Sequence, residues 1–309
     1  MPIVWQISVL NLSQKAFIKG TVLIKSPVPK ICFSGIICHL YTVLKSYFTG
    51  TYSEKNIIVE INGLDYSVKT DAAGSFSLTT DYQANKIRIF NKEKVEKFEI
   101  VQTYPVYFTS TPDTLGVISD IDDTIIVSYT ADALRRIATI IFTPPLKRKI
   151  IDFTSKLMEF LQNQTQSVYY VSKSENNLFG IISTIISHHK LPEGLLFLTP
   201  YLKFKELFKK KKGIDFKFST IEFLILNAGH QKYVLFGDDT QKDMAVYAAI
   251  AKKYPEKIAR IFIRQTKTVI NKQKKHYIEE LKKIFSDTVY FNQNTDLKKE
   301  IEILNKLDD

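Results

Sequence analysis

The feature that most constrains the fold is an alternation of short apolar runs with amphipathic stretches over residues 115–263. The runs have the length of buried strands, and the stretches between them carry apolar residues at helical spacing. Strands that alternate with helices form a parallel sheet with helices on both faces. The predicted strands are residues 115–119, 168–171, 194–198, 233–236 and 258–263, and the predicted helices are residues 147–161, 178–186, 218–225 and 241–252. We therefore predict a doubly wound α/β domain over residues 113–270.

The first third of the sequence follows another pattern. Short β-branched runs are separated by turn signals such as Asn62-Gly63, which is typical of an antiparallel sandwich. The stretch from Thr70 and Asp71 to Gly74 and Phe76 resembles the transthyretin-like modules often attached to enzymes. We predict an all-β sandwich domain over residues 1–112. Residues 271–309 are expected to form a mostly helical tail packed on the α/β domain.

Two acidic clusters directly follow two of the predicted strands. Residues 120–124 read Asp-Ile-Asp-Asp-Thr, and residues 237–243 contain three more aspartates. The carboxyl ends of parallel strands share one edge of the sheet, where such folds bind ligands. Crowded carboxylates repel one another unless a cation compensates them, and Mg²⁺ prefers oxygen ligands. The sequence therefore predicts a magnesium site, with Asp120, Asp122 (through its backbone carbonyl), Asp238 and Asp243 as ligands.

The order Asp120-x-Asp122-x-Thr124 predicts a separate role for each of the three residues in phosphate transfer. Asp120 is the expected nucleophile, which would form an aspartyl-phosphate and split one difficult displacement into two. Asp122 would protonate the leaving oxygen and later accept a proton from water. Thr124 would donate a hydrogen bond back to the loop and lie at the phosphate.

The remaining phosphate oxygens call for a hydroxyl and a cation. Ser172 ends a predicted strand, and Lys217 begins the helix that precedes the second acidic cluster. Ser172, Lys217 and the neighbouring Lys173 are therefore predicted to contact the phosphate, with catalytic roles for Ser172 and Lys217.

Together these residues resemble the four signatures of the haloacid dehalogenase superfamily of phosphatases. Residues 116–125, 169–174, 191–194 and 237–243 look like the catalytic domain of the actin-patch-protein phosphatidate phosphatases and their bacterial relatives. This resemblance implies a haloacid dehalogenase-type fold and Mg²⁺-dependent conversion of phosphatidate to diacylglycerol. The sequence departs from the family at three positions: Lys173 and Glu175 stand where Asn and Pro are usual, and Asp239 where Ser is common.

The net charge of the chain indicates which kinds of partner it could bind. Lysine and arginine number 43 against 32 acidic residues, a formal net charge of +11. Such an excess favours polyanions, namely nucleic acid, anionic membranes or phosphorylated ligands, although a solvated basic surface explains it equally. Residues 201–212 mix apolar side chains with lysines and predict either a helix on a membrane surface or one packed on the sheet. Residues 137–142 are read as a cap over the site or as core. No nucleic acid is expected.

Membrane crossing is not predicted, because no apolar run approaches the roughly 18 to 20 residues that a bilayer requires. The two cysteines, Cys32 and Cys38, fit neither a disulfide framework nor a metal knuckle, so reduced thiols in core or sheet positions are expected. His39 is assigned to the same environment. The expected location is cytoplasmic, with peripheral contact at the membrane.

Three functions stay open at this stage. The leading hypothesis is a phosphatase that acts on a membrane phospholipid, with phosphatidate as the substrate. The second is a soluble phosphatase acting on a sugar phosphate or nucleotide. The third is a non-catalytic module that binds a membrane or a protein partner. A panel of lipid and soluble esters, with and without Mg²⁺, separates the three.

Overall fold

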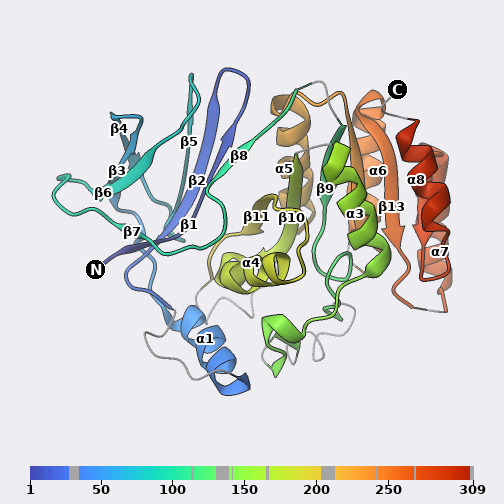
Figure 1. Ribbon diagram of the computed structural model, residues 1–309, viewed down its shortest axis with the longest axis horizontal. Helices are drawn as coiled ribbons and strands as arrows, with labels where there is room; N and C mark the ends of the chain where they lie inside the picture. Colours follow the sequence, from blue (N-terminus) through green and yellow to red (C-terminus); the bar gives the residue numbers. More distant parts are fainter. Residues whose placement is uncertain are drawn as a thin grey trace.

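The computed structural model describes residues 1–27, 35–112, 115–129, 139–140, 142–164, 167–202, 213–240, 242–267 and 269–306. An α/β region is built on one parallel sheet, and two smaller sheets precede it in the chain (Figure 1).

The parallel sheet is the predicted one, with one strand added. Its spatial order is β11-β10-β9-β12-β13-β14, and every neighbouring pair is parallel. The strands are β9 (Leu115–Ser119), β10 (Val168–Glu175), β11 (Leu195–Thr199), β12 (Lys232–Asp238), β13 (Ile258–Arg264) and β14 (Thr288–Phe291). The chain winds outward from β9 in one direction and from β12 in the other. The topological switch point, where such sheets bind ligands, therefore lies between β9 and β12.

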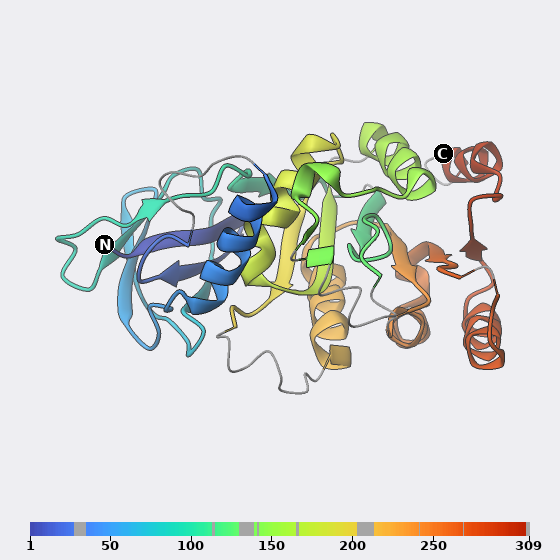
Figure 2. The same cartoon turned by 90° about the horizontal axis from the view of Figure 1, so that it is seen from below.

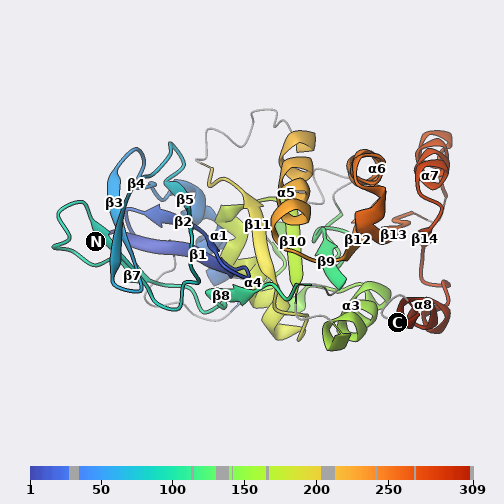
Figure 3. The same cartoon turned by 90° about the horizontal axis from the view of Figure 1, so that it is seen from above.

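Helices cover both faces of this sheet. Figure 3 shows α5, α6 and α7 on one face and α3, α4 and α8 on the other. Their bounds are α3 (Asp152–Gln164), α4 (Phe179–His188), α5 (Gly213–Asn227), α6 (Asp243–Lys253), α7 (Lys272–Ile284) and α8 (Leu297–Asn305). The prediction started α3 five residues too early, because Ile150 is extended and pairs with Ile126. Short 3₁₀ turns also occur, including η1 (Pro145–Lys147) and η2 (Asn176–Leu178).

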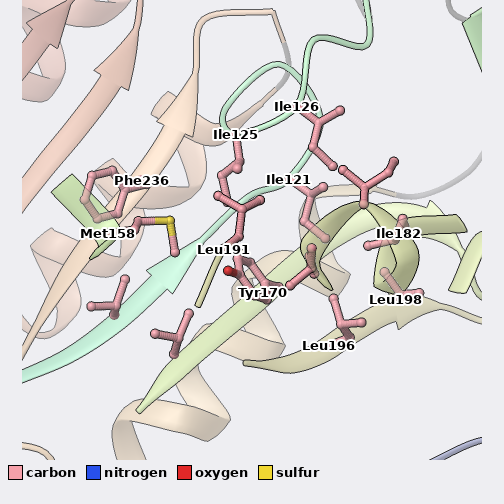
Figure 4. Close-up of a cluster of buried hydrophobic side chains, with 14 of the residues drawn as sticks. Ile121, Ile125, Ile126, Met158, Tyr170, Ile182, Leu191, Leu196, Leu198 and Phe236 are labelled. Carbon is pink, nitrogen blue, oxygen red and sulfur yellow. The ribbon is translucent and has the colours of Figure 1, made fainter. Parts of the chain in front are cut away.

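Each face of the sheet has its own apolar core. The core under α3 and α4 includes Tyr170, Leu196 and Phe236 from the strands and Met158 and Ile182 from the helices (Figure 4). The core on the opposite face is formed by residues of β12, β13 and helices α5, α6 and α7. A sheet buried on both sides explains why its strands read as continuous apolar runs rather than as alternating ones.

The N-terminal region departs from the prediction of an all-β, antiparallel sandwich. Its larger sheet has the order β5-β2-β1-β7, and β8 also pairs with β1. Because β1 is parallel to both β7 and β8, this sheet is mixed. The smaller sheet, β4-β3-β6, is antiparallel. The strands are β1 (Ile3–Asn11), β2 (Ala16–Leu23), β3 (Asn56–Ile61), β4 (Leu64–Lys69), β5 (Ser75–Thr80), β6 (Ile87–Asn91), β7 (Glu99–Ile100) and β8 (Tyr107–Thr109).

A helix, α1 (Ile36–Phe48), interrupts this β region. It carries Cys38 and His39, so neither lies in a sheet, whereas the expected core position is confirmed for His39, which is buried. Cys38 is disulfide-bonded, which corrects the expectation of a reduced thiol there. Cys32 lies outside the described residues. Among the described helices, none has the length and apolar composition needed to cross a bilayer.

The N-terminal sheets pack directly on the α/β region. Trp5 Nε1 donates to Asn176 O at 2.8 Å, and Tyr104 Oη donates to Gly194 O at 2.8 Å. Ile3, Trp5 and Tyr104 belong to the same apolar core as the residues under α3 and α4. The two regions therefore share a core instead of meeting across a wet interface.

The C-terminal tail contains a strand that the sequence analysis did not predict. Residues 288–291 form β14, which pairs with β13 and extends the sheet. The tail is therefore part of the α/β region's framework. Of the segment 201–212, residues 203–212 lie outside the described part of the chain, as do residues 137, 138 and 141 of the segment 137–142.

Candidate active site

Asp120 occupies the first position after β9, at the switch point. Its backbone N–H donates to Phe236 O of β12 at 2.9 Å, which fixes the residue between the two central strands. The loop that follows turns back into the core, where Ile121, Ile125 and Ile126 are buried (Figure 4). These three isoleucines anchor the loop on which Asp120 and Asp122 are placed.

The second acidic cluster meets the first, as the strand positions predict. Asp238 ends β12 and Asp243 begins α6, and the Asp238 N–H donates to Asp243 Oδ2 at 3.3 Å. Thr240 donates to Asp238 Oδ1 through both its N–H and its hydroxyl. Carboxylate oxygens of Asp120, Asp238 and Asp243 all lie within 4.8 Å of one another.

Gly237 makes this close approach possible. A Cβ atom at position 237 would lie 2.8 Å from a ring carbon of Tyr247 and 2.9 Å from Cβ of Asp243. Neither neighbour has room to retreat, because Tyr247 and Asp243 are both buried. A side chain at this position would push α6 and its carboxylate away from β12.

Lys217 of α5 reaches into the same cluster. Its Nζ lies 2.5 Å from Asp243 Oδ1 and 3.0 Å from Asp120 Oδ1, and the side chain is 1% exposed. Sequence reasoning selected Lys217 among several neighbouring lysines, and the structure places this lysine among the acids. Lys173 is partly buried, and burial together with the charge of Lys217 lowers its pKa, an effect that the three nearby acids oppose.

Burial and mutual repulsion shape the ionisation of the cluster. Burial raises the pKa of Asp120 well above its usual range, despite the attraction of Lys217. Burial and the neighbouring Asp243 raise the pKa of Asp238 to about 7. For Lys217, burial lowers the pKa, but the attraction of Asp120 and Asp243 outweighs it and holds the pKa above its usual value. The ammonium is therefore firmly charged, whereas the protein alone does not fully stabilise the carboxylates.

The donor set fits a divalent cation. With three ionised aspartates and one ammonium, the buried cluster carries a formal charge of −2, which one Mg²⁺ would neutralise. Both Asp120 carboxylate oxygens are buried and accept no hydrogen bond of acceptable geometry from the residues that the structure describes. Oxygen-only ligands from three aspartates match the preference of this ion. The Asp122 carboxylate is not part of this group.

Asp122 instead faces the end of β10. Its Oδ2 accepts hydrogen bonds from Ser174 Oγ at 2.5 Å and from Ser172 Oγ at 3.4 Å. Ser172 Oγ also accepts the Ser174 N–H at 3.0 Å. Asp122 is partly exposed, unlike the fully buried Asp120. Ser172 thus lies at the site, but it contacts Asp122, and Ser174 makes the shorter bond.

Thr124 does not play the structural role predicted for it. Its hydroxyl is buried and has no hydrogen-bond partner among the described residues. The side chain of Asp123 closes the loop instead, because Asp123 Oδ1 accepts the N–H groups of Ser128 at 2.9 Å and Tyr129 at 3.0 Å. Asp123 also adopts a left-handed backbone conformation, with φ of 57°.

Sequence reasoning missed a set of residues that brace the site from the side of β13 and β14. Arg264 Nη1 donates to Asp123 O at 2.7 Å. Asp239 is buried, and its carboxylate accepts from Tyr290 Oη at 2.7 Å and pairs with Lys274 Nζ at 2.8 Å. Asp239 was visible as an unusual acid at its position, but its partners are distant in sequence, so no local pattern identifies them.

The fold and the site define an α/β enzyme domain with a buried carboxylate–lysine centre at the switch point of its sheet. Residues 115–265 match the family model described as "Phosphatidate phosphatase APP1, catalytic domain". The matched segment contains the eight residues predicted from the sequence to form the site. The match supports a phosphatidate phosphatase-like hydrolase.

Two fungal proteins are similar to the chain over a longer stretch. An uncharacterised protein of Schizosaccharomyces pombe is 25% identical over 235 residues, covering 72% of this chain and 38% of that protein. "Phosphatidate phosphatase APP1" of Saccharomyces cerevisiae is 26% identical over 200 residues, covering 63% of this chain and 34% of that protein. The chain thus spans little more than a third of the length of these relatives.

Solved structures show only remote likeness. A chain of the Pnkp1/Rnl/Hen1 complex has a TM-score of 0.31 and 15% identity, covering 50% of this chain and 52% of that one. A carbohydrate acetylesterase from Xanthomonas citri has a TM-score of 0.33 and 10% identity, covering 96% and 71%. Scores this low carry no argument about function.

Proposed function

We propose that this protein is a Mg²⁺-dependent phosphatase of the haloacid dehalogenase type that hydrolyses phosphatidate to diacylglycerol and inorganic phosphate. The observation that carries the proposal is the buried cluster in which Lys217 lies between Asp120 and Asp243, with Asp238 beside them. The match of residues 115–265 to a phosphatidate phosphatase catalytic domain supports the choice of substrate.

In the first step Asp120 attacks phosphorus, and the bond from phosphorus to the lipid oxygen breaks. An aspartyl-phosphate forms on Asp120, and the leaving oxygen takes a proton from Asp122. The position of Asp120 between β9 and β12 holds the nucleophile still. Lys217 opposes the rise that burial causes in the pKa of Asp120, and it attracts the phosphate, which reduces the repulsion between two anions.

In the second step water attacks the phosphorus of the aspartyl-phosphate. Asp122 accepts the proton of that water, inorganic phosphate leaves, and Asp120 is restored. Hydrogen bonds from Ser174 and Ser172 orient Asp122 for both transfers. Asp120, Asp238 and Asp243 would hold the Mg²⁺ ion, which when bound neutralises charge on the phosphoryl oxygens.

The surroundings of Asp122 also favour a leaving group with an apolar part. The small cavity beside it, about 20 Å³, is lined by isoleucines, among them Ile121, Ile140 and Ile182, and by the polar side chains of Ser128, Arg148 and Ser174. We infer that the enzyme takes its substrate from a lipid surface, as a peripheral protein.

The test is phosphate release from phosphatidate in detergent micelles, with Mg²⁺ and with a chelator. We expect activity only with Mg²⁺, and a loss of at least about a thousandfold in Asp120→Asn, which has no nucleophile. Asp287→Asn is the control, because Asp287 is an exposed acid. Full activity of Asp120→Asn would contradict the proposed chemistry. Faster turnover of sugar phosphates than of phosphatidate would contradict the proposed substrate.

A further inference from the structure

Exposed apolar side chains gather on one part of the surface. Eighteen large hydrophobic residues are exposed in the described part of the chain, and seven of them lie on α1 or in residues 142–146. The seven are Ile36, Ile37, Tyr41, Leu44, Phe48, Phe142 and Leu146. A concentration of this kind in two short segments marks an interaction surface.

Helix α1 presents its apolar residues outward. His39, Val43, Ser46 and Tyr47 face the protein and are buried. Ile37, Tyr41, Leu44 and Phe48 are spaced at helical intervals along the opposite side, and Ile37 is 84% exposed. An apolar stripe on the outer side of a helix is normally covered, and no described residue buries this one.

The second segment is fixed beside α1. The His39 ring nitrogen Nε2 and Ile140 O are joined by a hydrogen bond of 2.8 Å. The buried Arg148 donates to Thr139 O at 2.8 Å and to Thr143 O at 3.2 Å, which holds the backbone that carries Phe142. The two segments that carry the exposed side chains therefore lie next to each other, and we call their exposed apolar residues together the α1 face.

The charged residues of the two segments are all basic. Residues 35–51 and 139–151 contain no aspartate or glutamate. They do contain Lys45 at the end of α1 and the exposed Lys147 and Lys149. Apolar side chains bordered by lysines complement an anionic lipid surface, where the rings and aliphatic groups enter the acyl region and the ammonium groups meet headgroups.

The α1 face also adjoins the candidate active site. Asn177 Nδ2 donates to Ser46 O of α1 at 3.2 Å, and Asn177 follows the end of β10, where Ser174 bonds to Asp122. In Figure 1 α1 lies at the lower end of the molecule, toward which the carboxyl end of β13 points. Figure 2, viewed from that end, shows α1 in the foreground.

We propose that the α1 face docks the protein onto an anionic lipid bilayer and so presents the carboxyl edge of the sheet to the membrane surface. As a route to substrate, this inference rests on the proposed phosphatidate phosphatase activity. As a binding event, it stands on the geometry of the face alone.

The experiment separates binding from catalysis. Full-length protein is sedimented with vesicles of phosphatidylcholine and phosphatidylglycerol, an anionic lipid that has no phosphate monoester to hydrolyse. The double variant Ile37→Ser, Phe48→Ser is compared with Val95→Ser, Leu226→Ser, because the exposed fractions match: 84% and 67% against 84% and 64%. We expect the α1 variant to bind roughly tenfold or more weakly than the wild type, and the control to bind like the wild type. Phosphatidylcholine vesicles alone should bind less protein than the anionic ones.

Activity assays complete the design. The α1 variant should hydrolyse a soluble ester such as p-nitrophenyl phosphate at the wild-type rate, which shows that it is folded, and phosphatidate in vesicles more slowly. Equal vesicle binding by the α1 variant and the control overturns the docking proposal. So does a lack of binding by the wild type combined with self-association through α1. Vesicle binding that depends on α1, without hydrolysis of any ester, leaves docking intact and overturns the proposed function.

Discussion

Lys217 is enclosed by carboxylates, and its energetic role differs from that of a surface lysine. Its ammonium contacts Asp120 and Asp243 inside the protein, whereas Lys253 makes a solvated pair with Glu222. Removing one partner of a buried ion pair leaves an uncompensated charge in a medium that solvates it poorly. Removing one partner of an exposed pair changes little.

We therefore expect Lys217→Met to lower the free energy of unfolding by about 3–5 kcal/mol and Lys253→Met to leave it almost unchanged. Urea denaturation of metal-free protein measures both. Similar losses in the two variants would show that the cluster does not depend on Lys217 for its charge balance.

The buried acidic cluster should also make the stability of the protein depend on pH. The pKa of Asp238 is raised from 3.8 to about 7 in the folded protein. A carboxyl with a raised folded pKa stabilises folding fully below its unfolded pKa, and this contribution is lost as the pH rises through about 7. Metal-free protein should therefore be less stable at about pH 8 than at about pH 6, and Mg²⁺ should restore stability mainly at the higher pH.

Asp238→Asn should flatten this dependence, and Asp287→Asn, at an exposed site, should leave it unchanged. The measurement is chemical denaturation at the two pH values with and without Mg²⁺. A wild-type protein whose stability rises with pH in the absence of metal would contradict the assignment.

The site residues that could be predicted from the sequence are those that directly follow a predicted strand. Asp120 and Asp238 stand directly after apolar runs, so their meeting could be expected from topology. The bond between Ser174 and Asp122 and the unpartnered hydroxyl of Thr124 could not be expected, because they depend on rotamers set by packing. The role of Arg264 could not be predicted either, since it contacts Asp123, which lies 141 residues away in the sequence.

Among the elements, the tail has the least obvious connection to the site. β14 supplies Tyr290 and α7 supplies Lys274, and both contact the carboxylate of Asp239, the neighbour of Asp238. The edge strand and its helix therefore brace the loop that carries the second acidic cluster. Both elements lie beyond the segment that matches the family model.

We expect Tyr290→Phe to destabilise the protein by about 1–2 kcal/mol, because one oxygen of a buried carboxylate loses its donor. The looser loop should also weaken Mg²⁺ binding, which titration calorimetry measures. Tyr277→Phe is the matched control, since Tyr277 is exposed on α7. Equal Mg²⁺ affinity in both variants would mean that the tail does not position the site.

Whether a helix or strand could be predicted depended on whether its own sequence carries a clear periodic pattern. The strands β9 to β13 and the helices between them follow from periodicity. α1 was missed because its polar residues His39 and Ser46 face the protein while apolar residues face outward, the reverse of the arrangement expected of a surface helix. β14 was missed because four residues between two helices carry little pattern, and only pairing with β13 makes them a strand.

At the scale of the molecule, one apolar core extends from the α/β region into the N-terminal sheets, which also have a core of their own. Trp5 is buried at their junction, where its ring contacts Phe179 edge-on with centroids 6.2 Å apart. Its Nε1 bonds to Asn176, directly after the strand that carries Ser172 and Ser174. Disturbance at this junction should therefore reach the site.

We expect the wild-type protein to unfold in a single transition, and Trp5→Ala to lower the free energy of unfolding by about 3–5 kcal/mol. Denaturation followed by both circular dichroism and phosphatase activity provides the check. Two separate transitions, with activity surviving the first, would show that the regions are energetically independent.

The glycine at position 237 should also be required in related proteins that use the same acidic cluster. Because the approach of Tyr247 and Asp243 excludes even a methyl group there, the position can be read as a marker in other genomes. A related gene that keeps every aspartate but has lost this glycine should encode a protein whose acids no longer converge. Such a copy would be a degenerate one, recognisable from a single codon.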